Sequence, residues 1–220
     1  MIEREKISPQ KIIHINLAYD FSLYDKPNQE EVDRLRNQYT ADVILLCITR
    51  LVPHKRPEMA VMTVKKLKEM GLTTKLIVLG KGILMDSLIA QAQELNLTDC
   101  IIFPGYVNNV LDYMAAADFL LHPSVSESSC VVVKEAGLVQ LPVIVNKGVG
   151  DFDEVIIHER NGFLVNSDMF AEEAAQVIFK KYLRKSELAD IGKRLEESVR
   201  ERFSITNIAE EYNALNGHVI

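Results

Sequence analysis

The sequence of 220 residues has no long hydrophobic run and no excess of basic residues. No apolar stretch approaches the ~18 residues that a membrane-spanning helix needs, and the start MIEREKISPQ lacks the hydrophobic core of a signal peptide. The 25 Lys and Arg residues against 31 Asp and Glu give a net charge of −6, with both signs interspersed. We therefore expect a soluble protein that is neither exported nor membrane-spanning and has no nucleic acid partner.

Cysteine is also scarce. Cys47, Cys100 and Cys130 are odd in number and widely spaced, which does not suit a disulfide framework. Two of them fall in apolar runs, where small buried thiols are common. This usage predicts a reducing compartment, the cytoplasm.

Several cofactor and metal motifs are absent. Gly80-Lys81-Gly82 lacks the third glycine of a dinucleotide fingerprint, there is no GxxxxGK[ST] loop, and the five histidines lack metal-ligand spacing. Asp151-Phe152-Asp153 matches a minimal DxD metal motif, but Asp151 with Glu154 three residues on favours a capped helix start. We therefore expect no metal site.

Short apolar runs alternate with stretches of helical periodicity along most of the chain. The expected strands are residues 43–51, 75–79, 100–103, 118–122, 142–145 and 163–165. The expected helices include residues 57–70, 84–95 and 131–139. This order predicts an α/β fold, a doubly wound parallel sheet with helices on both faces, and ligands at the carboxyl ends of its strands.

Both ends of the chain differ from this pattern. Residues 11–17 look like a strand, 20–27 like a loop and 30–39 like a polar helix or linker. After Val165, residues 169–203 and 204–215 are expected to form a helical tail. The length suits one domain.

A cluster of cations follows the first expected core strand. Arg50, His54, Lys55 and Arg56 precede a helix that begins near Pro57. Cations and free helical N–H groups at a sheet crevice can neutralise a diphosphate. A solvated basic loop is the alternative.

The fourth expected strand runs through a serine-rich loop into a helix. Glu127 lies in the loop and Glu135 in the helix, eight residues later, or about 12 Å if both were helical. N–H groups at the helix start suit an anion, and the two carboxylates could bracket a diphosphate between a sugar and a ribose. Cys130 has no partner that the sequence identifies, so a nucleophilic role is not expected.

A third candidate is the turn at residues 103–107, also at the carboxyl end of a strand. Gly105 would let the backbone approach a flat ligand such as a nucleotide base. An ordinary turn is the alternative.

These motifs, taken in order, resemble the carboxy-terminal domain of family 4 (group 1) glycosyltransferases, which are retaining enzymes. The resemblance covers roughly residues 43–165, and a terminal helix extends it. The matching segments are RLVPHK, LIVLGKG, IIFPGYV, LLHPSVSES, the pair Glu127 and Glu135, LPVIVNKGVGDFDEVI, NGFLV and RFSITNIAEEY. The resemblance implies a Rossmann-like domain that is one half of a GT-B fold.

The resemblance also implies roles for individual residues. Arg50 and Lys55 would contact the diphosphate of a nucleotide sugar, Glu127 would lie beside the transferred hexosyl group, and Glu135 would hold the ribose. The base would face the backbone of residues 103–107. The other donor-binding positions that it implies are Gly80, Gly105, Tyr106, Val107, Ser128, Ser129, Cys130 and Val131. No metal or other cofactor is implied.

One departure from the family pattern affects the donor loop. The family usually has Gly-Phe-Gly where this chain has Ser128, Ser129 and Cys130. Side chains there could crowd the donor, change the sugar preference or accompany loss of activity. The alternative function is therefore a degenerate, non-catalytic donor domain that acts as a partner or regulatory module. A related GT-B epimerase or phosphorylase is also left open.

A second departure concerns the acceptor-binding amino-terminal domain of the family, for which no counterpart precedes Lys11. The segment KIIHINLAYD resembles the family's interdomain crossover. We therefore expect residues 1–40 to be a linker and residues 41–220 the nucleotide-sugar-binding domain, with little transfer by the chain alone. Peripheral membrane association is an expectation for the complete enzyme.

Overall fold

The computed structural model describes residues 12–216, which divide into two compact units. The larger unit is Asp25–Val199, and the smaller one contains residues 12–24 and 200–216. Within residues 12–216, no helix is both long enough and apolar enough to cross a membrane.

The larger unit contains a parallel sheet. In the described part of the chain it has six strands in the order β3-β2-β1-β4-β5-β6. These are β1 (Val43–Ile48), β2 (Thr74–Leu79), β3 (Ile101–Gly105), β4 (Phe119–His122), β5 (Val143–Asn146) and β6 (Phe163–Val165). This is the doubly wound order that the sequence predicts. The first strand ends earlier than expected, because Thr49 and Leu51 instead continue into a loop bonded to Leu79 and Lys81.

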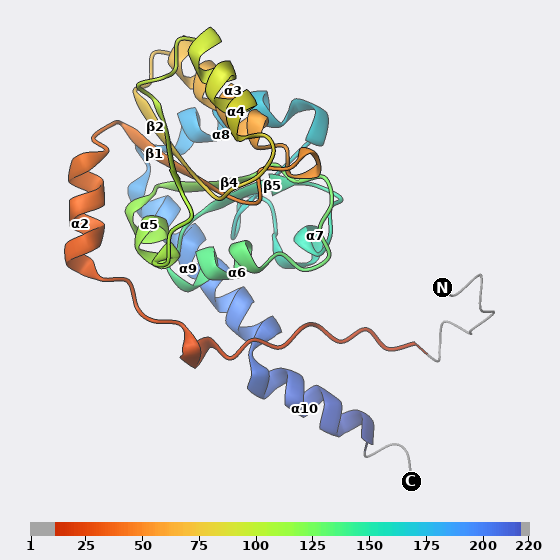
Figure 1. The fold of residues 1–220 in the computed structure, drawn as a ribbon. Coiled ribbons are helices and arrows are strands. Elements are labelled where there is room, and N and C mark those ends of the chain that lie inside the picture. Colours follow the sequence, from red (N-terminus) through yellow and green to blue (C-terminus); the bar gives the residue numbers. More distant parts are fainter. Residues whose placement is uncertain (1–11, 217–220) are drawn as a thin grey trace, which may run out of the picture. The chain divides into compact units, whose positions relative to one another are not determined.

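Helices cover both faces of the sheet (Figure 1), with α3, α4 and α8 on one face and α5, α6 and α9 on the other. The helices of the larger unit are α2 (Gln29–Gln38), α3 (Pro57–Glu69), α4 (Met85–Glu94), α5 (Val110–Ala116), α6 (Val131–Leu138), α7 (Phe152–Val155), α8 (Phe170–Lys181) and α9 (Lys185–Phe203), the last of which continues into the smaller unit. Short 3-10 turns are η3 (Pro53–Lys55) and η4 (Ser167–Met169). Because the strands are covered on both faces, most residues of β1, β2, β4, β5 and β6 are buried, which explains their continuous apolar runs, whereas only Ile101 is buried in the edge strand β3.

The polar segment before the sheet is a helix, α2. Its start is capped by Asn28, whose Oδ1 accepts hydrogen bonds from the backbone N–H of Glu30 and Glu31. Val32 and Leu35 are buried. The expected strand at residues 11–17 is wrong for residues 12–17, which form no strand and expose Ile12, Ile13 and Leu17; Lys11 lies outside the described residues.

The smaller unit joins two distant parts of the chain. The Tyr19 N–H donates to the Phe203 carbonyl at 2.7 Å, and the Ile205 N–H donates to the Tyr19 carbonyl at 3.0 Å. The rings of Tyr19 and Phe203 meet edge to face. After Phe203 the chain continues as α10 (Ile205–Asn216), so the predicted helical tail is confirmed.

Candidate functional site

Two loops meet where the strand order of the sheet reverses, between β1 and β4. Open α/β sheets bind ligands beyond the carboxyl ends of the strands at this point. The loop after β1 contains η3, and its His54 carbonyl accepts hydrogen bonds from the Val125 N–H (2.9 Å) and the Ser124 hydroxyl (3.3 Å). These bonds tie the loop after β4 directly to the loop after β1.

Glu127 stands at the centre of the joined loops. Its Oε1 atom accepts from Lys55 Nζ at 2.5 Å and lies 2.6 Å from His122 Nε2. Its Oε2 atom makes no hydrogen bond within residues 12–216. Burial opposes ionisation, but the hydrogen bonds from His122 and Lys55 outweigh it and lower the pKa of Glu127 to about 2. The side chain is therefore a carboxylate with one oxygen engaged and one available.

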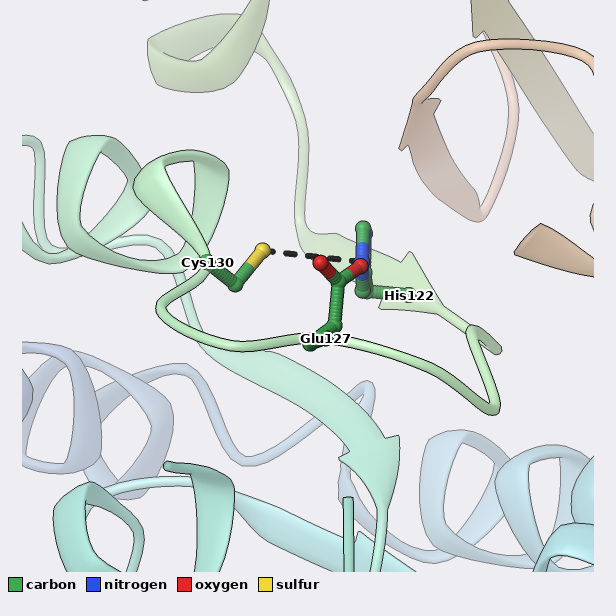
Figure 2. Close-up of side chains that lie close together, drawn as sticks. All are labelled: His122, Glu127 and Cys130. Atoms are coloured by element: carbon green, nitrogen blue, oxygen red, sulfur yellow. Dashed lines mark hydrogen bonds and ion pairs between the residues drawn. The ribbon is translucent and has the colours of Figure 1, made fainter. Parts of the chain in front are cut away.

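His122 and Cys130 complete this cluster (Figure 2). His122 ends β4, and its Nε2 atom lies 3.5 Å from Cys130 Sγ at the start of α6. Burial opposes protonation of His122, yet its hydrogen bonds with Cys130 and Glu127 raise its pKa to about 9. The sequence prediction missed His122 and gave Cys130 no partner. The only signal for His122 was its place at the carboxyl end of a strand.

The hydroxyl of Ser129 faces a buried ion pair. Lys134 of α6 is 1% exposed and pairs with Asp151 Oδ2, and the Ser129 Oγ atom bonds to both partners at 3.0–3.1 Å. Asp151 begins α7 as predicted, but its side chain does not cap the helix. The prediction of a side-chain cap is wrong because Lys134 and Ser129 take up the carboxylate.

The backbone of the loop is left available for an anion. The N–H groups of residues 127–130 donate no hydrogen bond within the described chain, and Cys130 gives α6 no side-chain cap. Gly150 packs closely against this loop. It has a φ of +55°, and a Cβ atom at this position would lie 2.8 Å from the Cβ atom of Glu127. Free N–H groups at a helix start suit a phosphate or carboxylate.

A cavity of about 540 Å³ lies at the carboxyl ends of β1 and β2, and the chain just after β3 also lines it. Four of the predicted residues line it, namely Arg50, Gly80, Tyr106 and Val107. Gly80 is required by close packing, because a Cβ atom there would lie 1.9 Å from the Thr49 carbonyl oxygen. Its N–H donates to the carbonyl of Gly105, which has a φ of +82°.

The other predicted residues differ in exposure and in their contacts. Arg50, which lines the cavity, is exposed and makes no ion pair within residues 12–216, so it can meet an anion. Arg56 donates to the backbone and hydroxyl oxygens of Ser167 and therefore has a structural role. Ser128 and Val131 are exposed. Glu135 is half-buried in α6, its carboxylate has no hydrogen-bond partner among the described residues, and burial raises its pKa.

Comparisons with known proteins agree with this fold. Residues 28–198 match the family model for glycosyl transferases group 1. The chain is 26% identical to N-acetyl-alpha-D-glucosaminyl L-malate synthase of Bacillus anthracis, over 96% of this chain and 55% of that protein. It is 27% identical to N-acetylgalactosamine-N,N'-diacetylbacillosaminyl-diphospho-undecaprenol 4-alpha-N-acetylgalactosaminyltransferase of Campylobacter jejuni, over 76% and 44%.

Among solved structures, Anabaena HepE in complex with UDP is similar, with a TM-score of 0.80 and 23% identity over 91% of this chain and 56% of that one. The chain thus spans about half the length of the relatives it matches. The sheet and its helices form the Rossmann-like half of a GT-B fold. Because the family model matches most of the sequence, the chain belongs to the glycosyl transferases group 1 family.

Proposed function

We propose that this chain is the donor-binding part of a family 4, retaining glycosyltransferase that transfers a hexosyl group from a nucleoside-diphosphate sugar. The observation that carries the proposal is the convergence of Lys55, Glu127 and the unpaired N–H groups of residues 127–130 beyond β1 and β4. A diphosphate needs cations and N–H donors, and a sugar needs a fixed acceptor for its hydroxyls. All of these lie in one pair of joined loops.

The contacts of Lys55 and Glu127 suit these two roles, binding of the diphosphate and binding of the sugar. Lys55 has three ammonium hydrogens and uses one on Glu127, which leaves two for phosphate oxygens. The Oε2 atom of Glu127 has no partner within the described residues and can accept from a sugar hydroxyl. As the anomeric bond breaks, Lys55 and Arg50 would stabilise the leaving diphosphate while Glu127 holds the sugar.

The nucleotide would extend from this point into the cavity beside Gly80 and Tyr106. Arg50 lines that cavity and follows the same strand as Lys55, so it can reach the diphosphate from the nucleoside side. Glu135, unpaired and half-buried, is the proposed acceptor for the ribose hydroxyls. UDP is the first nucleotide to test, because HepE has been solved with UDP and with UDP-glucose.

The loop that departs from the family pattern has a structural explanation. Ser129 and Cys130 direct their side-chain atoms to Lys134, Asp151 and His122. Because these contacts occupy the side chains, the backbone N–H groups remain for a donor. This arrangement favours a competent donor site over a degenerate, non-catalytic module.

The proposed reaction needs no metal and takes place in the cytoplasm, in agreement with three free cysteines. The acceptor would be bound by a second, amino-terminal GT-B domain, and the complete enzyme would associate peripherally with a membrane. Tested by themselves, residues 1–220 should bind nucleotide weakly and transfer little sugar.

The test is a calorimetric titration with UDP, GDP, ADP and their sugar conjugates, with and without magnesium. We expect saturable binding of one nucleotide that magnesium does not change. Arg50→Ala and Glu135→Ala should each weaken it by about tenfold, the effect of losing one charge-assisted hydrogen bond. Lys193→Ala, an exposed cation of α9, is the matched control and should bind normally.

The outcomes separate the proposal from its alternative. Binding that both site variants weaken supports a donor site. Equal binding by wild type, Arg50→Ala and Glu135→Ala would place the nucleotide elsewhere, and absence of binding to every nucleotide would favour a non-catalytic module.

A further inference from the structure

Three side chains with different donor atoms converge at the end of β4. His122 comes from the strand, Glu127 from the loop and Cys130 from the start of α6 (Figure 2). One nitrogen, one carboxylate oxygen and the sulfur all lie within 4.8 Å of one another. Such a group is found at no other place within residues 12–216.

These three ligand atoms, a nitrogen, an oxygen and a sulfur, are typical of a zinc site. Imidazole, thiolate and carboxylate together suit zinc better than magnesium or calcium, which prefer oxygen alone. Zinc bonds of about 2.3 Å to sulfur and about 2.0 Å to nitrogen, at a tetrahedral angle, put these two atoms about 3.6 Å apart. His122 Nε2 and Cys130 Sγ are 3.5 Å apart, so they already have that spacing.

We propose that His122, Glu127 and Cys130 form a binding site for zinc(II), with the fourth position open to water or a ligand. His122 and Cys130 are 2% and 4% exposed, whereas Glu127 is more accessible and gives the ion its route of entry. The 2.6 Å contact between His122 Nε2 and Glu127 Oε1 is a hydrogen bond, so the ion must replace the proton that this bond shares.

Lys55 makes this site weaker than a structural zinc site. Its ammonium group lies 2.5 Å from Glu127 Oε1 and repels a dication, but the ion can use Oε2, which has no other partner among the described residues. The three side chains also bond to one another in the absence of metal. The site therefore binds zinc reversibly and the fold does not depend on it.

Zinc would act against donor binding. This consequence rests on the proposed function, in which the Glu127 carboxylate holds the sugar and the adjacent N–H groups hold the diphosphate. An ion coordinated by Glu127 and Cys130 occupies the carboxylate and fixes the loop between them. Bound zinc therefore opposes binding of the nucleotide sugar and is not a cofactor of the transfer reaction.

The test of the site uses cobalt(II) as a spectroscopic substitute for zinc, with a thiol-free reductant. Wild type should bind one cobalt ion and show a thiolate-to-cobalt charge-transfer band, and zinc should remove that band by competition. Cys130→Ala should lose the band and bind zinc at least tenfold more weakly, since loss of an outer-shell partner alone costs about 10–100-fold. Cys100→Ala, a half-buried thiol outside the cluster, is the control and should retain both.

A folding control accompanies these variants. Thermal unfolding in the presence of a chelator identifies a variant that fails to fold, and His122→Gln provides a second ligand deletion if Cys130→Ala unfolds. The site is refuted if wild type shows no charge-transfer band, or if the folded ligand variants bind zinc as tightly as wild type.

A second titration measures the effect on nucleotide. We expect zinc to weaken UDP binding at least tenfold in wild type. In Cys130→Ala, zinc should leave the affinity for UDP unchanged, whatever that affinity is in the absence of zinc. An unchanged UDP affinity in zinc-saturated wild type would overturn the antagonism. If wild type binds no nucleotide at all, the proposed function fails, while the cobalt spectrum still decides on the metal site.

Discussion

Glu127 is ionised because two cationic side chains share one of its oxygens. Lys55 comes from the loop after β1 and His122 from the end of β4, so the carboxylate joins two parts of the chain that only the folded sheet brings together. A half-buried Glu without such partners has the opposite behaviour, and Glu135 is an example, since burial raises its pKa.

Glu135→Gln should stabilise the chain at neutral pH. A raised pKa means that the folded chain holds the proton more tightly than the unfolded chain, so the ionised form costs stability above the ordinary pKa of 4.5. We expect the melting temperature to rise by about 1–3 °C at pH 7, and the gain to vanish below the ordinary pKa. Scanning calorimetry across this pH range tests the expectation.

Glu197→Gln, an exposed change in α9, is the matched control and should shift the melting temperature little at either pH. A Glu135 variant that melts at or below the wild-type temperature at pH 7 would show that this carboxylate is stabilised in the fold by some other means. Stabilisation together with weaker nucleotide binding would mark Glu135 as a residue that costs stability and serves binding.

Sequence reasoning found part of this site and missed the rest for a physical reason. Lys55 and Glu127 follow strand ends and have types that suit phosphate or sugar, so their placement was predictable, whereas Cys130 was expected there only from the family resemblance. His122 ends an apolar run and Lys134 lies inside one, and a single polar residue in such a place gives little local signal. Their partners come from distant or irregular segments, and only the folded chain shows the contacts.

At the scale of elements, α6 and α7 are joined by the buried pair of Lys134 and Asp151. Two buried charges repay their desolvation only when both are present. Ser129 adds hydrogen bonds to both and connects the pair to the loop after β4.

Lys134→Met should therefore lower the free energy of unfolding by about 3–5 kcal/mol, because Asp151 is left as an uncompensated buried charge. The double variant Lys134→Met with Asp151→Ala should recover most of this loss. Lys193→Met, an exposed change in α9, controls for the substitution itself. Urea unfolding gives the comparison, and a double variant as unstable as Lys134→Met would show that the pair contributes more than mutual neutralisation.

The secondary structure was easier to predict than the site. All six core strands were located, because strands covered on both faces form continuous apolar runs. The segment at residues 12–17 misled the prediction, since Ile12, Ile13 and Leu17 form an apolar run that stays exposed. Apolar composition predicts a strand only where a neighbouring strand is available to pair with it.

At the scale of the whole molecule, the family match and the larger compact unit nearly coincide. The match covers residues 28–198, and the unit is Asp25–Val199. The sheet, the core and every residue of the candidate site lie inside these limits.

A fragment of residues 25–199 should therefore fold and keep the site. We expect it to unfold cooperatively and to bind the nucleotide that the full chain binds, with an affinity within about twofold, a difference of less than 0.5 kcal/mol. Circular dichroism and calorimetry on both proteins make the comparison. An unfolded fragment, or affinity reduced tenfold, would show that the deleted residues, 1–24 or 200–220, contribute to the fold or the site.

The reversal of strand order between β1 and β4 also determines when the site can exist. Lys55 and Glu127 are 72 residues apart in the chain. At a synthesis rate of about 5–20 residues per second, Lys55 leaves the ribosomal active centre roughly 4–14 s before Glu127. For that interval the cationic loop after β1 has neither its carboxylate nor the backbone partner that holds it. The nascent chain therefore carries an exposed basic loop, open to any polyanion nearby, until β4 takes its place in the sheet.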